Sequence, residues 1–189
     1  MKRALIAVIA GLLPTLLFAQ SQKKPQLSNG DLTSEQIAVY RDFLASYDTA
    51  SRQSINLSEA TSTFRPDEGD YAGCMKDFPQ IEGIFEIHMF RASFARETHV
   101  RLVDYEKFKL SEPEAAVRRG DTIEKSVEAG FAGGILTISE ILFDKRHHLA
   151  ALHYSFMCGG LCGHSETIVL RRSRRRWVQT QKSCGFGIS

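Results

Sequence analysis

Four short β-rich runs in the last third of the chain, separated by very short connections, most restrict how it can fold. The runs consist of residues 135–143, 149–157, 166–171 and 176–181. Each is rich in branched and aromatic residues and is bounded by turn-forming ones, as β-strands are. The connections are at most eight residues long, too short for the crossover that parallel neighbours need. The sequence therefore predicts a C-terminal antiparallel β-meander of about four strands.

The residues upstream of this meander favour helices. Thr33 and Gln36 form a capping box, and apolar side chains follow at helical spacing, which predicts a helix over residues 34–47. Further helices are predicted over residues 84–94, 113–119 and 122–131, short strands over residues 54–57 and 100–103, and an irregular loop over residues 65–80. One face of an antiparallel sheet has to be covered, and these helices are the available cover. The expected fold is a single α+β domain, with N-terminal helices packed on the meander.

The N-terminus has the order of a cleavable signal peptide. Basic Lys2 and Arg3 precede an uncharged, mostly apolar run over residues 4–18, and the small residue Ala19 precedes a polar segment. The apolar run is about 15 residues long, whereas a transmembrane helix needs about 20. We therefore expect residues 1–19 to be a signal peptide, residues 20–33 a flexible leader and residues 34–189 the domain. The predicted location is periplasmic or extracellular, and the chain is not expected to be an integral membrane protein.

Removal of the signal peptide changes the charge of the chain. The full sequence has 24 Lys and Arg against 22 Asp and Glu. Loss of Lys2 and Arg3 lowers the first number to 22, so the formal net charge of the mature chain is zero. A chain without a positive excess gives no support to nucleic-acid binding.

The four cysteines, Cys74, Cys158, Cys162 and Cys184, all lie in the mature part. An even number of cysteines in an exported chain predicts disulfides, because the compartment is oxidising. Four cysteines allow three pairings. We favour Cys158 with Cys162 and Cys74 with Cys184, since the glycines around the first pair let a tight loop bring its ends together.

The C-terminal third combines several elements in a fixed order. They are a strand, a Cys-Gly-Gly-Leu-Cys-Gly loop at residues 158–163, a second strand, a charged turn followed by Trp177, and an end at Ile188-Ser189. In this combination it resembles a group of uncharacterised exported bacterial proteins, and residues 34–57 look like the N-terminal part of longer members. The group has no established activity, so the resemblance implies no site residue. Its members tend to carry a glycine in the charged turn, which is absent from residues 172–176 here.

Residues 158–164 are the one place where reactive groups lie together in the sequence. A zinc site there would use Cys158, Cys162 and His164, with Cys184 or His153 as the fourth ligand, because zinc takes four thiolate or imidazole ligands. An oxidising compartment favours disulfides over thiolates. Structural bridges are therefore preferred over zinc or redox chemistry, and neither a metal nor a cofactor is predicted.

Two charged segments are candidates for binding. Five arginines lie at the tip of a predicted hairpin: Arg171, Arg172, Arg174, Arg175 and Arg176. They could contact anionic lipid, lipopolysaccharide or another polyanion, or they could form a solvated turn whose charges discourage strand-to-strand aggregation. Asp67, Glu68 and Asp70 fall short of a calcium-binding loop and are interpreted as surface charge.

These patterns favour a non-enzymatic exported module that binds an anionic envelope component or another protein. The alternatives are an extracytoplasmic, hydrolase-like enzyme with a site near residues 158–164, and a structural envelope component. A pocket lined by two or more titratable groups with shifted pKa values would favour an enzyme, whereas a flat exposed surface would favour a binding module.

Overall fold

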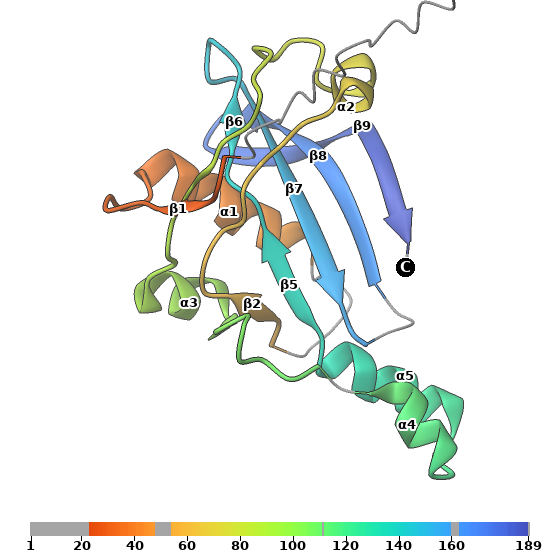
Figure 1. Ribbon diagram of the computed structural model, residues 1–189. Helices are drawn as coiled ribbons and strands as arrows, with labels where there is room; N and C mark the ends of the chain where they lie inside the picture. The colour runs from red at the N-terminus through yellow and green to blue at the C-terminus, as the bar shows by residue number, and fades with distance from the viewer. Residues whose placement is uncertain (1–22, 48–53, 111, 160–162, 189) are drawn as a thin grey trace, which may run out of the picture.

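The computed structural model describes residues 23–47, 54–110, 112–159 and 163–188 and is built around one mixed β-sheet (Figure 1). Its strands lie in the order β4-β2-β5-β7-β8-β9, and β6 also pairs with β7. These strands are β2 (Asn56–Ser58), β4 (Arg101–Val103), β5 (Ile135–Ile138), β6 (Leu142–Phe143), β7 (Leu149–Met157), β8 (Gly163–Ser173) and β9 (Arg176–Ile188). The helices are α1 (Ser34–Tyr47), α2 (Glu68–Gly73), α3 (Ala92–Thr98), α4 (Pro113–Arg118) and α5 (Ile123–Ala132). A separate two-stranded sheet joins β1 (Gln26–Leu27) to β3 (Glu86–Ile87).

The antiparallel half of the sheet follows from the short connections. β5, β7, β8 and β9 are neighbours, each antiparallel to the next. The prediction of a four-stranded antiparallel meander is nevertheless wrong for the sheet as a whole, which has seven strands among the described residues and is mixed. β2 runs parallel to both β4 and β5, with Leu57 opposite Leu102 and Leu136. The long β2–β4 connection contains α2 and α3, so it allows the parallel crossover that short connections exclude.

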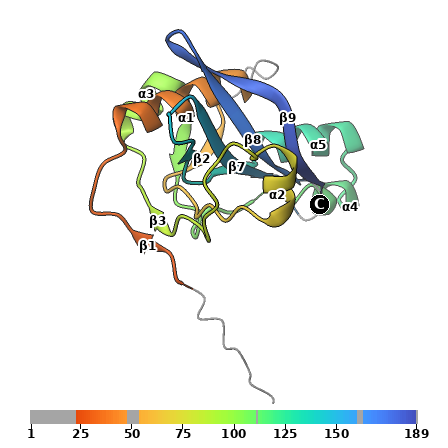
Figure 2. The same ribbon diagram turned by 90° about the horizontal axis from the view of Figure 1, so that it is seen from above.

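α1 forms over the residues that its sequence predicts and covers one face of the sheet. The Thr33 hydroxyl accepts the N–H of Gln36, and the Gln36 side chain accepts the N–H of Thr33, which completes the capping box. The buried face of α1 consists of Val39, Tyr40, Phe43 and Leu44, which pack in one cluster with Leu152, Ile168 and Leu170 of the sheet. Figure 2 shows α1 and α3 on one side of the sheet and α2 on the other.

Residues 84–94 do not form the predicted helix. Ile84 exchanges backbone hydrogen bonds with Phe64, β3 pairs in parallel with β1, and α3 begins only at Ala92. β1 lies within the predicted flexible leader, so that part of the leader is a paired strand. The sequence carries neither a helical nor a strand period here, and the pairing partners are too distant along the chain to be read from it.

The predicted strand over residues 135–143 is interrupted between β5 and β6. Ser139 leaves the regular ladder: its hydroxyl accepts the N–H of His153 at 2.8 Å, and its carbonyl accepts the Tyr40 hydroxyl at 2.9 Å. Glu140 is only 1% exposed, and its carboxylate accepts the Thr61 hydroxyl and the N–H of His88. The residues at this interruption therefore link the sheet to α1 and to the segments that contain Thr61 and His88.

α2 covers part of the opposite face, within the segment that the sequence predicts as an irregular loop. Its N-terminus is a reciprocal capping box, in which Asp67 accepts the N–H of Asp70 at 2.8 Å and Asp70 accepts the N–H of Asp67 at 3.0 Å. Cys74, the C-cap, is bonded to Cys184 of β9, with Cα atoms 5.0 Å apart. A second apolar cluster under α2 contains Phe64, Met75, Phe78, Ala151 and Val169. α2 is therefore held to the sheet by a covalent bond as well as by packing.

Two predicted features lie outside the described residues. These are the signal peptide, residues 1–19, and Cys162, the predicted disulfide partner of Cys158. Cys158 itself is buried at the end of β7, with 1% of its surface exposed. In the part of the chain that the structure describes, no helix is long and apolar enough to cross a bilayer.

Candidate functional site

A polar cleft begins where the apolar cluster under α2 ends. Alternate residues of a strand face opposite sides of a sheet, so Ala151 of β7 and Val169 of β8 both face α2. The next residues on this face are His153 and its cross-strand partner Thr167, followed by Ser165. The change from apolar to polar side chains at His153 and Thr167 therefore marks the inner wall of the cleft.

The cleft has a volume of about 400 Å³. It is lined by Thr63, Phe64, Arg65, Asp67, Asp70, His153, Ser165, Glu166, Thr167, Cys184 and Gly187. The Glu166 carboxylate accepts the hydroxyl of Tyr154, which packs in the α1 cluster. Burial and the Glu166 charge raise the pKa of Tyr154 to about 12. Besides Glu166, the charged or titratable residues that line the cleft are Arg65, Asp67, Asp70 and His153.

His153, Thr167 and Asp70 form a chain of polar groups across the cleft wall. His153 Nδ1 lies 3.1 Å from Thr167 Oγ1, and the Thr167 hydroxyl in turn stabilises the Asp70 carboxylate. Asp70 and Thr167 are 8% and 6% exposed. His153 Nε2 makes no hydrogen bond to any residue that the structure describes, and its ring lines the cavity. The free ring nitrogen of a fixed imidazole is therefore available to a molecule in the cleft.

Burial shifts the pKa values of Asp70 and His153, the two titratable groups at the ends of this series of polar side chains. It raises the pKa of the Asp70 carboxyl, although the Asp67 amide and the Thr167 hydroxyl act in the opposite direction. It lowers the pKa of the His153 imidazole, and the negative charge of Asp70 offsets only part of that effect. The cleft thus contains a neutral imidazole near pH 7. It also contains two titratable groups with shifted pKa values, the feature expected of an enzyme rather than of a flat binding surface.

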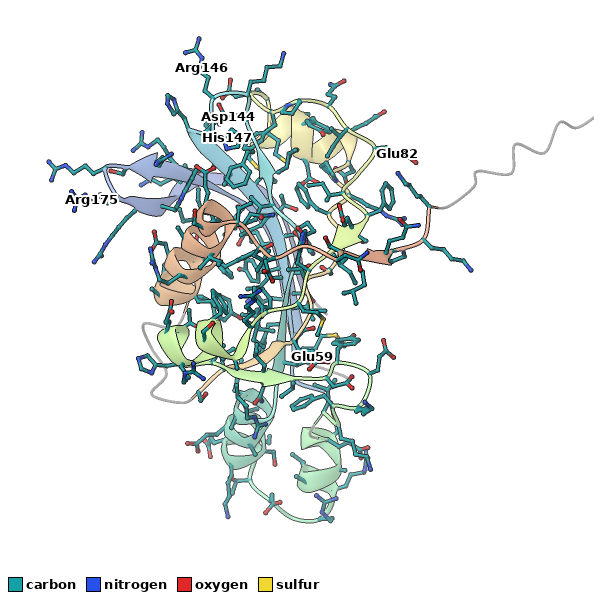
Figure 3. The ribbon with its side chains drawn as sticks, turned by 90° about the vertical axis from the view of Figure 1, so that its left-hand side faces the viewer. Glu59, Glu82, Asp144, Arg146, His147 and Arg175 are labelled. Atoms are coloured by element: carbon teal, nitrogen blue, oxygen red, sulfur yellow. A yellow bond between two sulfur atoms is a disulfide. The ribbon has the colours of Figure 1, made fainter. Side chains whose placement is uncertain are left out.

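A second candidate region is the end of the sheet that carries the arginine-rich hairpin. β7 pairs antiparallel with β8, with Leu149 opposite Arg171, so the β6–β7 turn lies beside the β8–β9 hairpin. The N–H of Arg172 donates to the His148 carbonyl at 2.9 Å. The two turns together expose seven cationic side chains, which we call the basic end: Lys145, Arg146, Arg171, Arg172, Arg174, Arg175 and Arg176. Figure 3 shows Arg146 and Arg175 projecting outward from these two turns.

Two carboxylates hold the turns of the basic end in place. Glu35 of α1 lies 2.8 Å from His147 Nδ1 and 3.2 Å from Arg172. Asp144 accepts the N–H groups of His148 and Leu149 at 2.6 and 2.7 Å. Burial alone would raise the pKa of Asp144, but these backbone hydrogen bonds lower it below its ordinary value. The turns are therefore fixed to the domain while most of their cationic groups stay exposed.

The two residues considered as a fourth zinc ligand, His153 and Cys184, lie away from His164. His164 lies on the α1 side, 3.3 Å from the Tyr47 hydroxyl, whereas His153 and Cys184 line the cleft on the other side, and Cys184 is bonded to Cys74. No group of three or more His, Cys, Asp or Glu in the described ranges is placed to hold a metal ion. The polar cleft lies on the opposite face of the sheet from His164.

The sequence interpretation missed parts of both regions. Asp70, taken as surface charge, is buried in the cleft wall, and Thr167 was not considered. The sequence did carry a signal for the cleft, because polar residues stand at alternate positions of the strands that line it. These are Ser165 and Thr167 on one strand and His153 on its neighbour. In the hairpin, Arg174 takes a φ of 55°, so the tight turn forms although no glycine is present.

No protein-family model, no curated protein and no solved structure matches the chain. A function has to be assigned from the chemistry of the cleft and of the basic end.

Proposed function

We propose that this domain is exported and docks through its basic end on an anionic, phosphate-bearing lipid surface of the cell envelope. The observation that carries the proposal is the pairing of β7 with β8, which adds Lys145 and Arg146 to the arginines of the hairpin. Most of these cations have no carboxylate partner among the described residues: Arg172 alone is in an ion pair. Unpaired cations are the groups that an anionic surface attracts.

The charge is unevenly distributed along the molecule. The mature chain has no net charge by the signal-peptide interpretation, so the positive end is balanced by acidic residues elsewhere. Residues 112–132, which include α4 and α5, carry five acidic and three basic side chains. Figure 3 places α4 and α5 at the opposite end of the molecule from Arg146 and Arg175. This separation of charge would orient the domain with its hairpin toward a negative surface.

The shape of the basic end suits a surface better than a small molecule. The cationic side chains project from two turns, and the hollow beside them, lined by Ser34, Glu35, Arg172, Arg175 and Trp177 among others, has a volume of only about 200 Å³. Glu35 lines this hollow with its negative charge and pairs with His147 and Arg172. A projecting hairpin beside a small hollow that is lined by a carboxylate favours contact with many headgroups over capture of one anion.

Sedimentation with lipid vesicles tests the proposal. The probe is a vesicle of phosphatidylglycerol mixed with phosphatidylcholine, compared with one of phosphatidylcholine alone. Each cation near an anionic surface contributes about 1 kcal/mol. The triple variant R174S/R175S/R176S should therefore lose about 3 kcal/mol of binding, which is roughly a 100-fold weaker affinity.

The matched control removes three cations from the other end, in the variant R118S/R119S/K125S, and should bind as the wild type does. Binding should also weaken as salt is raised, because the screening length falls from about 10 Å at 0.1 M to about 3 Å at 1 M. Equal binding by the hairpin variant and the wild type would show that the arginines form only a solvated turn.

A further inference from the structure

We propose that the polar cleft is a hydrolytic site for small uncharged or cationic esters, in which His153 is the general base and Thr167 and Asp70 are positioning residues. The cleft shares no lining residue with the basic end, so this activity is independent of docking.

The order of the hydrogen bonds determines which nitrogen of His153 is the base. The Thr167 hydroxyl favours the ionised form of the Asp70 carboxylate, which can only accept hydrogen bonds, so we assign the Thr167 proton to the side of Asp70. The Thr167 oxygen then accepts a hydrogen bond from the N–H at His153 Nδ1, and the two heavy atoms are 3.1 Å apart. The neutral ring is consequently unprotonated at Nε2, the nitrogen that has no partner among the described residues. His153 is also fixed through its backbone N–H, which donates to Ser139 Oγ at 2.8 Å.

The protonation state of His153 suits a base at neutral pH. Asp70 is the charged group that acts on the ring, and Arg65, Asp67 and Glu166 also line the cleft. The Arg65 guanidinium lies over the Phe85 ring and donates to the Lys23 carbonyl. Burial of the ring outweighs the attraction of Asp70 and keeps its pKa below the ordinary value of 6.5. The imidazole is therefore in its basic form over the whole neutral range, which a general base needs.

The lining of the cleft selects the class of substrate. Its charged residues other than His153 are Asp67, Asp70, Glu166 and Arg65, a set with a net negative charge, so a phosphate or carboxylate anion would be repelled. The hydroxyls of Thr63 and Ser165 line the same space and can donate to a carbonyl oxygen on which negative charge develops. An ester is favoured over an amide because an alkoxide leaves more readily than an amine anion.

The reaction balances without a further reactant. His153 Nε2 takes a proton from water as the water oxygen bonds to the carbonyl carbon of the ester. The tetrahedral adduct collapses, the bond between carbon and the alcohol oxygen breaks, and the proton on Nε2 passes to the departing oxygen. A carboxylic acid and an alcohol leave the cleft, and the imidazole is again neutral.

Another hollow, of about 450 Å³, is less suited to this chemistry. It is lined by Glu59, Asp104 and Glu106 among other residues, and no histidine lines it. Asp104 is paired with Lys107 at 2.5 Å. The carboxylates of this hollow have no histidine beside them that could act as a general base, so the hollow offers no site comparable to the polar cleft.

The test is hydrolysis of p-nitrophenyl acetate by the full purified chain, measured as kcat/KM against pH. The wild type should show saturable hydrolysis whose half-maximal rate lies below pH 6.5. H153Q should lower kcat/KM by at least about 100-fold, the usual contribution of a general base. H148Q, which removes an exposed histidine of the β6–β7 turn, is the matched control and should leave the rate unchanged.

The pair T167S and T167V separates positioning from packing. T167S keeps the hydroxyl and should retain the activity and pH profile, whereas T167V keeps the shape and should lower kcat about 10-fold while moving the pH midpoint. This pair decides the matter even if H153Q fails to fold, which near-ultraviolet circular dichroism would show. Three results would overturn the proposal: no saturable hydrolysis by the wild type, an equal loss in H148Q and H153Q, or identical profiles for T167S and T167V.

Discussion

Replacing Cys74 and Cys184 by alanine removes a bond between residues that are 110 positions apart. In the chain-entropy model, a cross-link closing a loop of this length restricts the unfolded chain by about 4.8 kcal/mol at 25 °C. Domains are typically stable by about 5–15 kcal/mol, so C74A/C184A should lose a large part of the folding free energy. α2 should also loosen, because it is short and carries the bonded Cys74 at its C-cap. Asp70 would then no longer be fixed against Thr167 and His153.

Urea denaturation followed by circular dichroism measures this loss. With a slope of about 2 kcal/mol per molar urea, the midpoint should fall by roughly 2 M. Reduction of the wild type should have a similar effect. The double variant keeps Cys158 and Cys162, so any further loss on reduction reports on that predicted pair. A loss of less than about 1 kcal/mol in the double variant would refute the argument that this cross-link restrains the unfolded chain.

Three further predictions concern stability. Burial lowers the pKa of His153 in the folded chain. As the pH drops below about 6.5, the unfolded chain therefore takes up a proton at this residue before the folded chain does, and the free energy of unfolding should fall. H153Q should remove that part of the pH dependence in urea titrations between pH 7 and 5. His99, the C-cap of α3, has a φ of 57°, a left-handed conformation that glycine adopts more easily. H99G should therefore raise stability by up to about 1 kcal/mol, whereas R96G within the helix should lower it by about 1 kcal/mol. Equal effects of the two variants on the thermal midpoint would contradict this prediction. Y40F leaves the buried Ser139 carbonyl without the Tyr40 hydroxyl and should cost about 1–3 kcal/mol in urea denaturation, and an unchanged midpoint would show that this carbonyl needs no partner.

Local sequence patterns predicted some elements of the fold and failed for others. α1 was predicted with its observed bounds, Ser34–Tyr47, because its capping box and apolar spacing lie within the helix itself. The antiparallel neighbours β7, β8 and β9 were predicted because their connections leave no other geometry. The parallel strands β2 and β4 were not assigned to the sheet, since their pairing depends on segments more than 40 residues apart. The predicted helix over residues 84–94 failed for the same reason, because β3 is defined by its partner β1.

The same distinction between local and long-range contacts applies to the two candidate sites. The sequence by itself determined the arginine-rich hairpin, the helix that packs on the sheet and the even set of cysteines, because each depends on neighbours along the chain. Only the tertiary structure decided that Lys145 and Arg146 lie beside the hairpin, and that Asp70 lies across from Thr167 and His153. These groups are brought together by the β7–β8 register and by α2, which Cys74 attaches to β9. A site between distant segments depends on how sheet faces and helices pack, and no local pattern of residues carries that information.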